Sequence, residues 1–209
     1  HPVFPRPILV SLMNSKTLTA AILAAAIGSA ALTAQSPTLL KDFNLDPNND
    51  SYSGGSTYWA VLGGAGYLNC QTVIHGNELW KITPASAGLV GEIGVGESDY
   101  VGNPRHNITY NGNVYFTAWK SALGREIYKT DGTSITLLKD IMPGNPEGGP
   151  FTSGPLSFYV YNGELYFTAD DGTNGRELWK TDGTTAGTVM VDDVAAGSAD
   201  GMGNTTEYE

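Results

Sequence analysis

The stretch GRELWKTDGTTAGT, residues 175–188, decides how the rest of the sequence is interpreted. It places a glutamate and a tryptophan directly before Asp182, Gly183 and Thr184, which are typical turn residues. Taken alone, Glu177 and Asp182 could form a pair of catalytic carboxylates. Taken as one copy of a repeat, the same residues belong to the scaffold, so the first question is whether the stretch recurs.

The stretch recurs at a period of about 50 residues. GNELWK begins at residue 76, GREIYK at residue 124 and GRELWK at residue 175. A second block precedes each copy, and its members are GGAGYLNC (63–70), NGNVYFTA (111–118) and NGELYFTA (162–169). A third block follows each copy, and its members are LVGEI (89–93), TLLKDI (136–141) and TVMVDDV (188–194). The sequence therefore contains three repeated units.

Each unit reads as four β-strands. In the third unit they are LSFYVY (156–161), ELYFTA (164–169), RELWKT (176–181) and TVMVDD (188–193). Asn162 and Gly163 join the first two and are a strong hairpin signal, because both accept positive φ. Four short strands per unit are typical of a propeller blade. The predicted fold is all-β, with repeated four-stranded antiparallel meanders that form a β-propeller or propeller-like array, incomplete in this chain.

TLLKDF (38–43) is an additional copy of the third block. A closed ring often completes its last blade with a strand from the other terminus, but the third unit already has its own last strand, TVMVDD. A ring also needs at least about four blades. We therefore expect the chain to be the N-terminal part of a longer one, in which further repeats of the same chain close the fold.

ELWKTDGTTAGT (177–188) resembles the signature of the bacterial ELWxxDGT repeat family. The resemblance covers about residues 37–200 and is specific in the third unit. The second unit has Ile127 and Tyr128 in place of Leu and Trp, and the first unit loses the Asp-Gly-Thr turn. The resemblance implies a large secreted or cell-surface protein with tandem repeats, and the family has no general biochemical activity assigned.

The recurring residues favour a structural role. Acid–base catalysis needs one pair of carboxylates in different environments, whereas a residue copied into every blade is better explained by the blade. An aspartate before Gly-Thr can bond to amides of its own turn, and the glutamate can tie its strand to a neighbouring loop. The alternative is a ligand groove repeated in each blade, since tryptophan beside a carboxylate also suits sugars. The structural signature is Glu78, Leu79, Trp80, Glu126, Tyr128, Asp131, Gly132, Thr133, Glu177, Leu178, Trp179, Asp182, Gly183 and Thr184.

Two acidic loops keep calcium open as an alternative to ordinary turn chemistry. The first contains Asp46, Asn48 and Asp50, but glycine and glutamate are missing where a calcium loop needs them. The second contains Asp170, Asp171 and Asn174. We otherwise predict no catalytic residue and no cofactor- or metal-binding residue.

The histidines and the cysteine give no catalytic pattern. His75 falls at a variable loop position and His106 is expected to precede a strand, and no second ligand or nucleophile stands at a recognisable spacing. Cys70, the one cysteine, aligns with Ala118 and Ala169, so we predict a small buried core residue. A single thiol also excludes an intramolecular disulfide.

The N-terminal region is predicted to be a targeting segment. From Met13 the chain has a lysine, an Ala-, Leu- and Ile-rich core and small residues, which is typical of a signal peptide over residues 13–34. Cleavage after Ala34 is favoured and cleavage after Ala31 is the alternative, with no membrane span left afterwards. Residues 1–12 look like translated upstream sequence, and residues 35–209 form the repeat region.

The composition suits an extracellular location and argues against nucleic acid as a partner. The chain has 209 residues, 27 glycines and a net charge of -10, with no basic patch. We predict a non-enzymatic secreted or cell-surface protein that works in adhesion or recognition, with an extracellular glycan or protein as partner. The alternatives are a polysaccharide-active propeller enzyme whose catalytic residues lie elsewhere, and a structural spacer.

Overall fold

The computed structural model describes residues 59–72, 74–93, 102–143 and 153–202. All regular elements in these ranges are β-strands. They are β1 (Ala60–Leu62), β2 (Ala65–Thr72), β3 (Gly76–Thr83), β4 (Ser86–Gly91), β5 (Gly102–Tyr110), β6 (Asn113–Lys120), β7 (Gly124–Thr130), β8 (Ile135–Lys139), β9 (Leu156–Tyr161), β10 (Glu164–Asp170), β11 (Arg176–Thr181) and β12 (Val189–Asp192). Over the described ranges, no helix of the length and apolarity needed to cross a membrane occurs.

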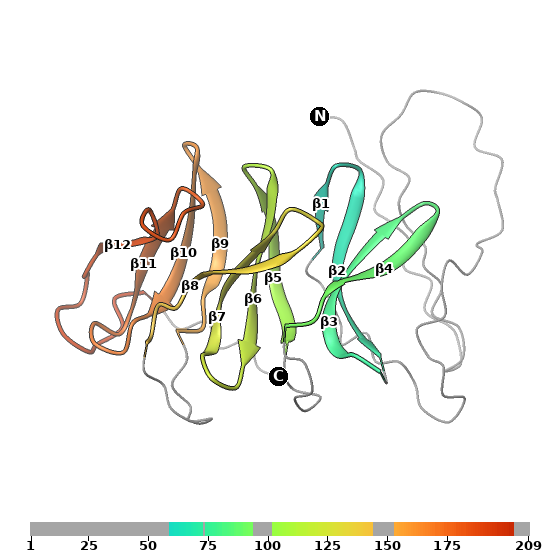
Figure 1. Ribbon diagram of the computed structural model, residues 1–209. Coiled ribbons are helices and arrows are strands. Elements are labelled where there is room, and N and C mark those ends of the chain that lie inside the picture. The colour runs from blue at the N-terminus through green and yellow to red at the C-terminus, as the bar shows by residue number, and fades with distance from the viewer. Residues whose placement is uncertain (1–58, 73, 94–101, 144–152, 203–209) are drawn as a thin grey trace, which may run out of the picture.

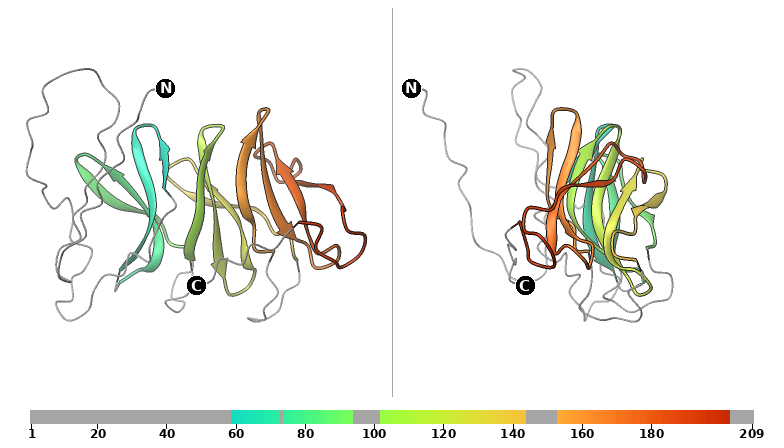
Figure 2. Two further views of the ribbon diagram at one scale, coloured as in Figure 1. Left: turned by 180° about the vertical axis from the view of Figure 1, so that it is seen from behind. Right: turned by 90° about the vertical axis from the view of Figure 1, so that its left-hand side faces the viewer.

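The strands form three four-stranded antiparallel meanders that lie side by side (Figure 1). We call β1–β4 the first blade, β5–β8 the second blade and β9–β12 the third blade. Within each blade, every strand pairs with the next strand along the chain. A parallel pair between Asn77 and Gly102 also joins the first blade to the second. Seen end-on, the three sheets lie one behind another (Figure 2).

The first strands of the blades meet along one edge of the array. The Thr109 hydroxyl of β5 donates to the carbonyl of Val61 in β1 at 2.7 Å, and the Tyr110 hydroxyl donates to the carbonyl of Gly163 at 2.8 Å. Among the described residues, the fourth strands β4, β8 and β12 lie farther from one another than β5 lies from β1 and β9. The blades therefore fan out from the edge that holds β1, β5 and β9, as propeller blades do around an axis. The predicted all-β, propeller-like fold is confirmed.

The hairpins between first and second strands rest on residues in left-handed conformation. Asn162 and Gly163 have φ of 49° and 80°, the combination that a two-residue hairpin with the twist of its strands requires. The same conformation recurs at residues 111–112 and 63–64. The strand boundaries predicted for the third unit agree with β9 and β11, and they differ by one residue at one end of β10 and at both ends of β12.

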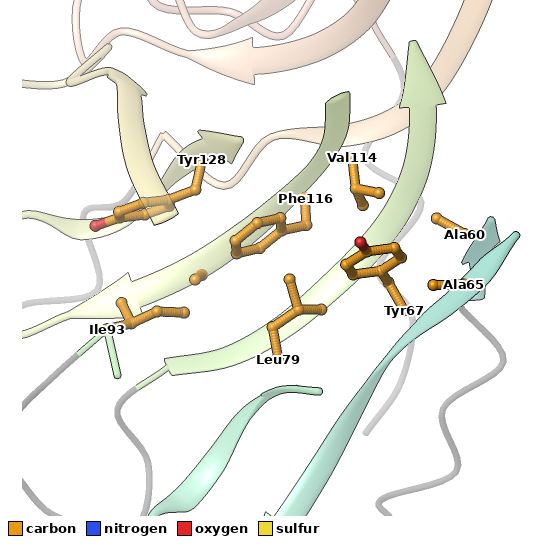
Figure 3. Packing of buried hydrophobic residues seen from close by; sticks show 9 residues of the cluster. Ala60, Ala65, Tyr67, Leu79, Ile93, Val114, Phe116 and Tyr128 are labelled. Atoms are coloured by element: carbon orange, nitrogen blue, oxygen red, sulfur yellow. The ribbon is translucent and has the colours of Figure 1, made fainter. Parts of the chain in front are cut away.

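Two hydrophobic clusters fill the space between neighbouring blades. In the first, Tyr67 and Leu79 of the first blade lie against Val114, Phe116 and Tyr128 of the second (Figure 3). The second cluster consists of Tyr115, Ile127, Leu138 and Ile141 of the second blade and Leu165, Phe167, Ala169 and Trp179 of the third. The second blade is therefore apolar on both faces, as a sheet between two others must be.

Several predicted segments lie outside the described residues. These are the upstream segment (1–12), the signal peptide (13–34), the additional strand TLLKDF (38–43) and the loop with Asp46, Asn48 and Asp50.

Candidate functional site

Each blade has a buried glutamate on its third strand. Glu78, Glu126 and Glu177 are 2%, 0% and 0% exposed. Each accepts a backbone N–H from the residue two positions beyond the fourth strand. These bonds join Ile93 to Glu78 at 3.0 Å, Ile141 to Glu126 at 2.9 Å and Val194 to Glu177 at 3.1 Å. The glutamate thus holds the end of the fourth strand against the third.

The same carboxylates also bind residues farther along the chain after the fourth strand. The Ser153 hydroxyl donates to Glu126 Oε2 at 2.6 Å, and the Gly201 N–H donates to Glu177 Oε1 at 2.9 Å. In the first blade, a Cβ on Gly102 would lie 3.0 Å from the glutamate oxygen. A buried carboxylate bound in this way to several backbone segments stabilises the fold and leaves little room for a substrate.

Glu126 differs from an ordinary carboxylate in its acidity. Burial raises the pKa of Glu126 to about 7, although the hydrogen bonds from Ser153 and Ile141 act in the opposite direction. The charge of Asp140 raises the pKa further. Glu126 Oε1 has no hydrogen-bond partner among the described residues. Folding is therefore coupled to a proton on this side chain near neutral pH.

The Asp-Gly-Thr turns are closed by their own aspartates. Asp182 Oδ1 accepts the Thr184 N–H and the Thr184 hydroxyl, both at 2.8 Å. Asp131 makes the equivalent bonds with Thr133, at 2.8 and 2.6 Å. The threonine hydroxyl bonds, with the backbone bonds, lower the pKa of Asp131 and of Asp182. Both carboxylates therefore stay charged and serve their turns.

The glycine of each turn contacts the preceding blade. The Lys81 ammonium donates to the Gly132 carbonyl at 3.3 Å, and the Lys129 ammonium donates to the Gly183 carbonyl at 2.7 Å. Gly132 and Gly183 have φ of 92° and 97°, so the turns need glycine. A Cβ on either glycine would also overlap a tyrosine hydroxyl of that preceding blade. We call this tyrosine and lysine the turn-binding pair: Tyr67 and Lys81 in the first blade, Tyr115 and Lys129 in the second.

Strand β5 is bent by residues that strands rarely contain. Asn103 and His106 have φ of 36° and 58°, and the pairing of β5 with β6 shifts register on both sides of Arg105. In β9, Ser157 has φ of 56° and the pairing with β10 also shifts. Such bulges redirect side chains and are frequent beside functional sites. The bend is therefore common to both blades.

The side chains at this bend are not common to both blades. The carbonyls of Asn103 and Gly154 are equivalent, because each accepts Nη1 of its own blade's third-strand arginine at 2.9 Å. The second blade has Asn103, Arg105, His106 and Asn107 on β5. The equivalents in the third blade are Gly154, which precedes β9, and Leu156, Ser157 and Phe158 on β9. The second blade is thus polar where the third is mostly apolar. We call Asn103, Arg105, His106 and Asn107 the β5 polar set.

Two members of the β5 polar set bind the first blade, and a third meets the third blade. The Asn69 amide donates to Asn103 Oδ1 at 3.2 Å, and the Asn107 amide donates to the Tyr67 carbonyl at 3.4 Å. Asn69 and Asn107 are buried, whereas Arg105 and His106 are half-buried. The His106 ring meets the ring of Phe158 edge-on, with centroids 6.3 Å apart. The cluster therefore combines amide, guanidinium and imidazole groups with an aromatic ring.

The sequence-based prediction for His106 is wrong. His106 does not precede a strand but lies within β5. The strand continues through it because the bulge places one residue in the left-handed region, where glycine, asparagine or aspartate is more usual. The signal that could have shown the site is the failure of Arg105, His106 and Asn107 to match residues 156–158 of the next unit.

The other histidine and the acidic loop do not extend this site. His75 Nδ1 lies 2.6 Å from Glu92 Oε1, with both side chains about a third exposed. Asp171 accepts the backbone N–H groups of Thr173 and Asn174 at 2.9 and 2.8 Å, as in an ordinary turn. Among the described residues, no group of histidine, cysteine and acidic side chains could hold a metal ion.

Comparisons with known proteins give only remote likenesses. No protein-family model matches the chain, and no curated protein matches it. Among solved structures, a Bacteroides ovatus protein described as "Xyloglucan PUL GH43B" matches with a TM-score of 0.38 and 16% identity over 64% of this chain and 29% of its own. A proposed exo-beta-1,3-galactanase of Bifidobacterium bifidum matches with a TM-score of 0.37 and 11% identity, over 66% of this chain and 51% of its own. An alpha-L-arabinofuranosidase of Clostridium thermocellum matches with a TM-score of 0.36 and 16% identity, over 65% of this chain and 50% of its own.

These structures contradict the prediction that the protein is not an enzyme, because the names of the matched proteins are those of glycoside hydrolases. The chain spans between about a third and a half of the length of the proteins it matches. At TM-scores below 0.5, the likenesses establish neither a shared substrate nor a shared reaction.

Proposed function

We propose that the protein is part of a polysaccharide-active β-propeller, in which the β5 polar set contacts the sugar. One observation carries the proposal: a polar cluster breaks the repeat on the strand that lies centrally along the edge where first strands meet. Repeated residues serve every blade alike, so a ligand that binds once is expected to use residues that occur once.

The chemistry of the cluster suits a carbohydrate. Asn103 is half-buried and carries an amide that both donates and accepts hydrogen bonds, and the half-buried Arg105 carries up to five N–H donors. Sugar hydroxyls need both kinds of partner. Trp59, 53% exposed beside the first residue of β1, offers an aromatic ring to the apolar side of a sugar ring.

The repeated carboxylates take no part in the reaction in this proposal. Glu78, Glu126 and Glu177 are bound to backbone N–H groups of the scaffold. The reacting carboxylates come from residues outside the described ranges, and β5 positions the substrate for them. The protein works outside the cell, as the predicted signal peptide at residues 13–34 and the resemblance to the secreted ELWxxDGT repeat family suggest.

Binding and turnover of soluble polysaccharides test the proposal. The intact protein is titrated with arabinan, galactan and xyloglucan, and released reducing sugar is measured in the same samples. We expect binding to at least one of the three, and a dissociation constant about tenfold higher for Arg105→Ala with His106→Ala. The matched control is Leu156→Ala with Ser157→Ala, which changes the equivalent bend of β9 and should leave affinity unchanged.

Two results would contradict the proposal. One is the absence of both binding and sugar release with every polysaccharide. The other is an equal loss of affinity in the β5 and β9 variants, because it would mean that the bend matters and the polar side chains do not.

A further inference from the structure

The outer face of the third blade, the side turned away from the second blade, is equivalent to a face that is buried elsewhere in the molecule. In the second blade, Leu138 and Ile141 are 2% and 4% exposed, because the third blade covers them. Their equivalents in the third blade, Val191 and Val194, are 44% and 62% exposed. Tyr161 is 65% exposed at the same face. The third blade therefore carries the apolar residues of a blade junction without a covering blade among the described residues.

The polar groups of a blade junction are present on this face too. In the second blade, the turn-binding pair Tyr115 and Lys129 receives the Gly183 turn. Tyr166 and Lys180 are the same pair in the third blade. Both are bound to a residue of their own blade, Glu164: Lys180 Nζ lies 3.0 Å and Tyr166 Oη 3.0 Å from its carboxylate. Glu164 thus occupies the place that a turn carbonyl takes at the two internal junctions.

The segment after the third blade follows the path that leads into a blade. At the second blade, the Gly154 N–H donates to the Arg125 carbonyl at 3.1 Å, directly before β9. At the third blade, the Met202 N–H donates to the Arg176 carbonyl at 3.0 Å. The preceding residues also bind the glutamates of their blades, Ser153 through its hydroxyl and Gly201 through its backbone N–H. Met202 therefore holds the place of the residue from which a further first strand starts.

The geometry points to the outer face of the third blade as the docking surface for one more blade of the same repeat. The Asp-Gly-Thr turn of that blade binds Tyr166 and Lys180 and displaces Glu164 from the lysine. Tyr161 donates to its first hairpin, as Tyr110 donates to Gly163. The apolar residues at positions 191 and 194 are covered by its second strand, which continues the interfaces already formed between the three blades.

A second copy of this chain fits the surface less well than a following blade. Both Asp-Gly-Thr turns of the described residues are already bound to the blade before them. The first blade has residues 83–86, Thr-Pro-Ala-Ser, where the others have this turn, so a proline stands in the place where a Cβ would overlap the tyrosine hydroxyl. The occupant must therefore be a blade whose Asp-Gly-Thr turn is free.

Insertion of one blade tests the docking surface. Residues 155–202 are inserted a second time after Met202, in the full chain, which continues the first strand in register. The inserted copy carries Lys180→Arg, so that of the two copies of this position only the original Lys180 can react with an amine reagent. The labelling rate of Lys180 is measured by mass spectrometry of its peptide. We expect labelling to slow about threefold, because the lysine then donates to the turn carbonyl, as the half-buried Lys129 does at the preceding junction.

The matched control is an insertion whose own Gly183 is changed to Val, which keeps the added strands but prevents its turn from reaching Tyr166. Labelling of Lys180 should then stay fast. A Lys180 rate that does not fall with the intact insertion would overturn the inference, and so would an inserted copy that gains no strand content by circular dichroism. Concentration-dependent dimers of the unextended protein that protect Lys180 would also overturn it, in favour of a second copy. The result is independent of polysaccharide binding, because β5 is unchanged.

Discussion

Strands β5 and β9 occupy equivalent places in their blades and bend at equivalent residues, yet they carry different side chains. His106 and Ser157 share the left-handed conformation, but the residues equivalent to Arg105 and Asn107 are Leu156 and Phe158. The third strands β7 and β11, by contrast, are alike, because their glutamates accept equivalent backbone hydrogen bonds in both blades. Repetition thus marks what every blade needs to fold. Departure from the repeat marks what the molecule needs once.

Removal of a repeated glutamate should have the largest effect on stability. Glu126→Ala leaves the Ile141 N–H and the Ser153 hydroxyl buried without an acceptor, at about 1–3 kcal/mol each. We expect a loss of about 4 kcal/mol in the free energy of unfolding, measured by urea denaturation. Glu126→Gln, which keeps one carbonyl oxygen, is the control and should lose less. A loss below about 1 kcal/mol in the alanine variant would contradict the structural role assigned to Glu126.

The acidity of the same carboxyl predicts a pH dependence. The folded pKa of Glu126 is raised from 4.5 to about 7, so between these values the unfolded chain releases a proton that the folded protein keeps. This contribution to stability is fully present below pH 4.5 and is lost as the pH rises to about 7, by about 3 kcal/mol in total. Urea midpoints at several pH values check it against Glu126→Gln, which should lack this slope. An equal slope in both proteins would contradict the assignment.

The Asp-Gly-Thr turn offers a comparison between two glycines of like conformation. Gly183 and Gly197 have φ of 97° and 89°, but only at Gly183 would a Cβ overlap another side chain, that of Tyr115. Gly197→Ala should therefore show backbone strain alone. We expect Gly183→Ala to lose about 2 kcal/mol more, because Tyr115 is buried and has no room to move. Equal losses in thermal or urea unfolding would mean that the turn does not depend on contact with the preceding blade.

The turn-binding lysines should differ between an internal junction and the outer face. Lys129→Met removes the bond to the Gly183 carbonyl, and we expect a loss of about 1 kcal/mol in the free energy of unfolding. Lys180→Met removes an exposed pair with Glu164 and should leave the urea midpoint unchanged. A larger loss for Lys180→Met than for Lys129→Met would reverse the distinction between the covered and the uncovered face.

The parts of the fold that depend on local sequence could be predicted. Asn162 and Gly163 gave the hairpin because their backbone preferences act within a few residues. The alternation of ELYFTA likewise gave the position of β10. Repetition added the equivalence of the three units, which fixed the order of the strands before their geometry was known.

The parts that depend on contacts between blades could not be predicted. The bond from Lys129 to Gly183 joins residues 54 positions apart, and no local preference reports it. The bend at His106 was missed because its left-handed conformation is imposed by pairing with β6 and lacks the glycine that usually announces it. The candidate site therefore became visible only when equivalent strands of two blades were compared in space.

The most direct test of the account is thermal unfolding with and without a bound polysaccharide, measured on Glu126→Gln and on Arg105→Ala with His106→Ala. A ligand that binds only the folded state raises the melting temperature by an amount that grows with the logarithm of its concentration over its dissociation constant. We predict that Glu126→Gln melts lower than the unchanged protein but keeps the full rise on adding ligand. Without ligand, the β5 variant should melt close to the unchanged protein, and its rise on adding ligand should be clearly smaller. A full rise in the β5 variant together with a reduced rise in Glu126→Gln would contradict the account.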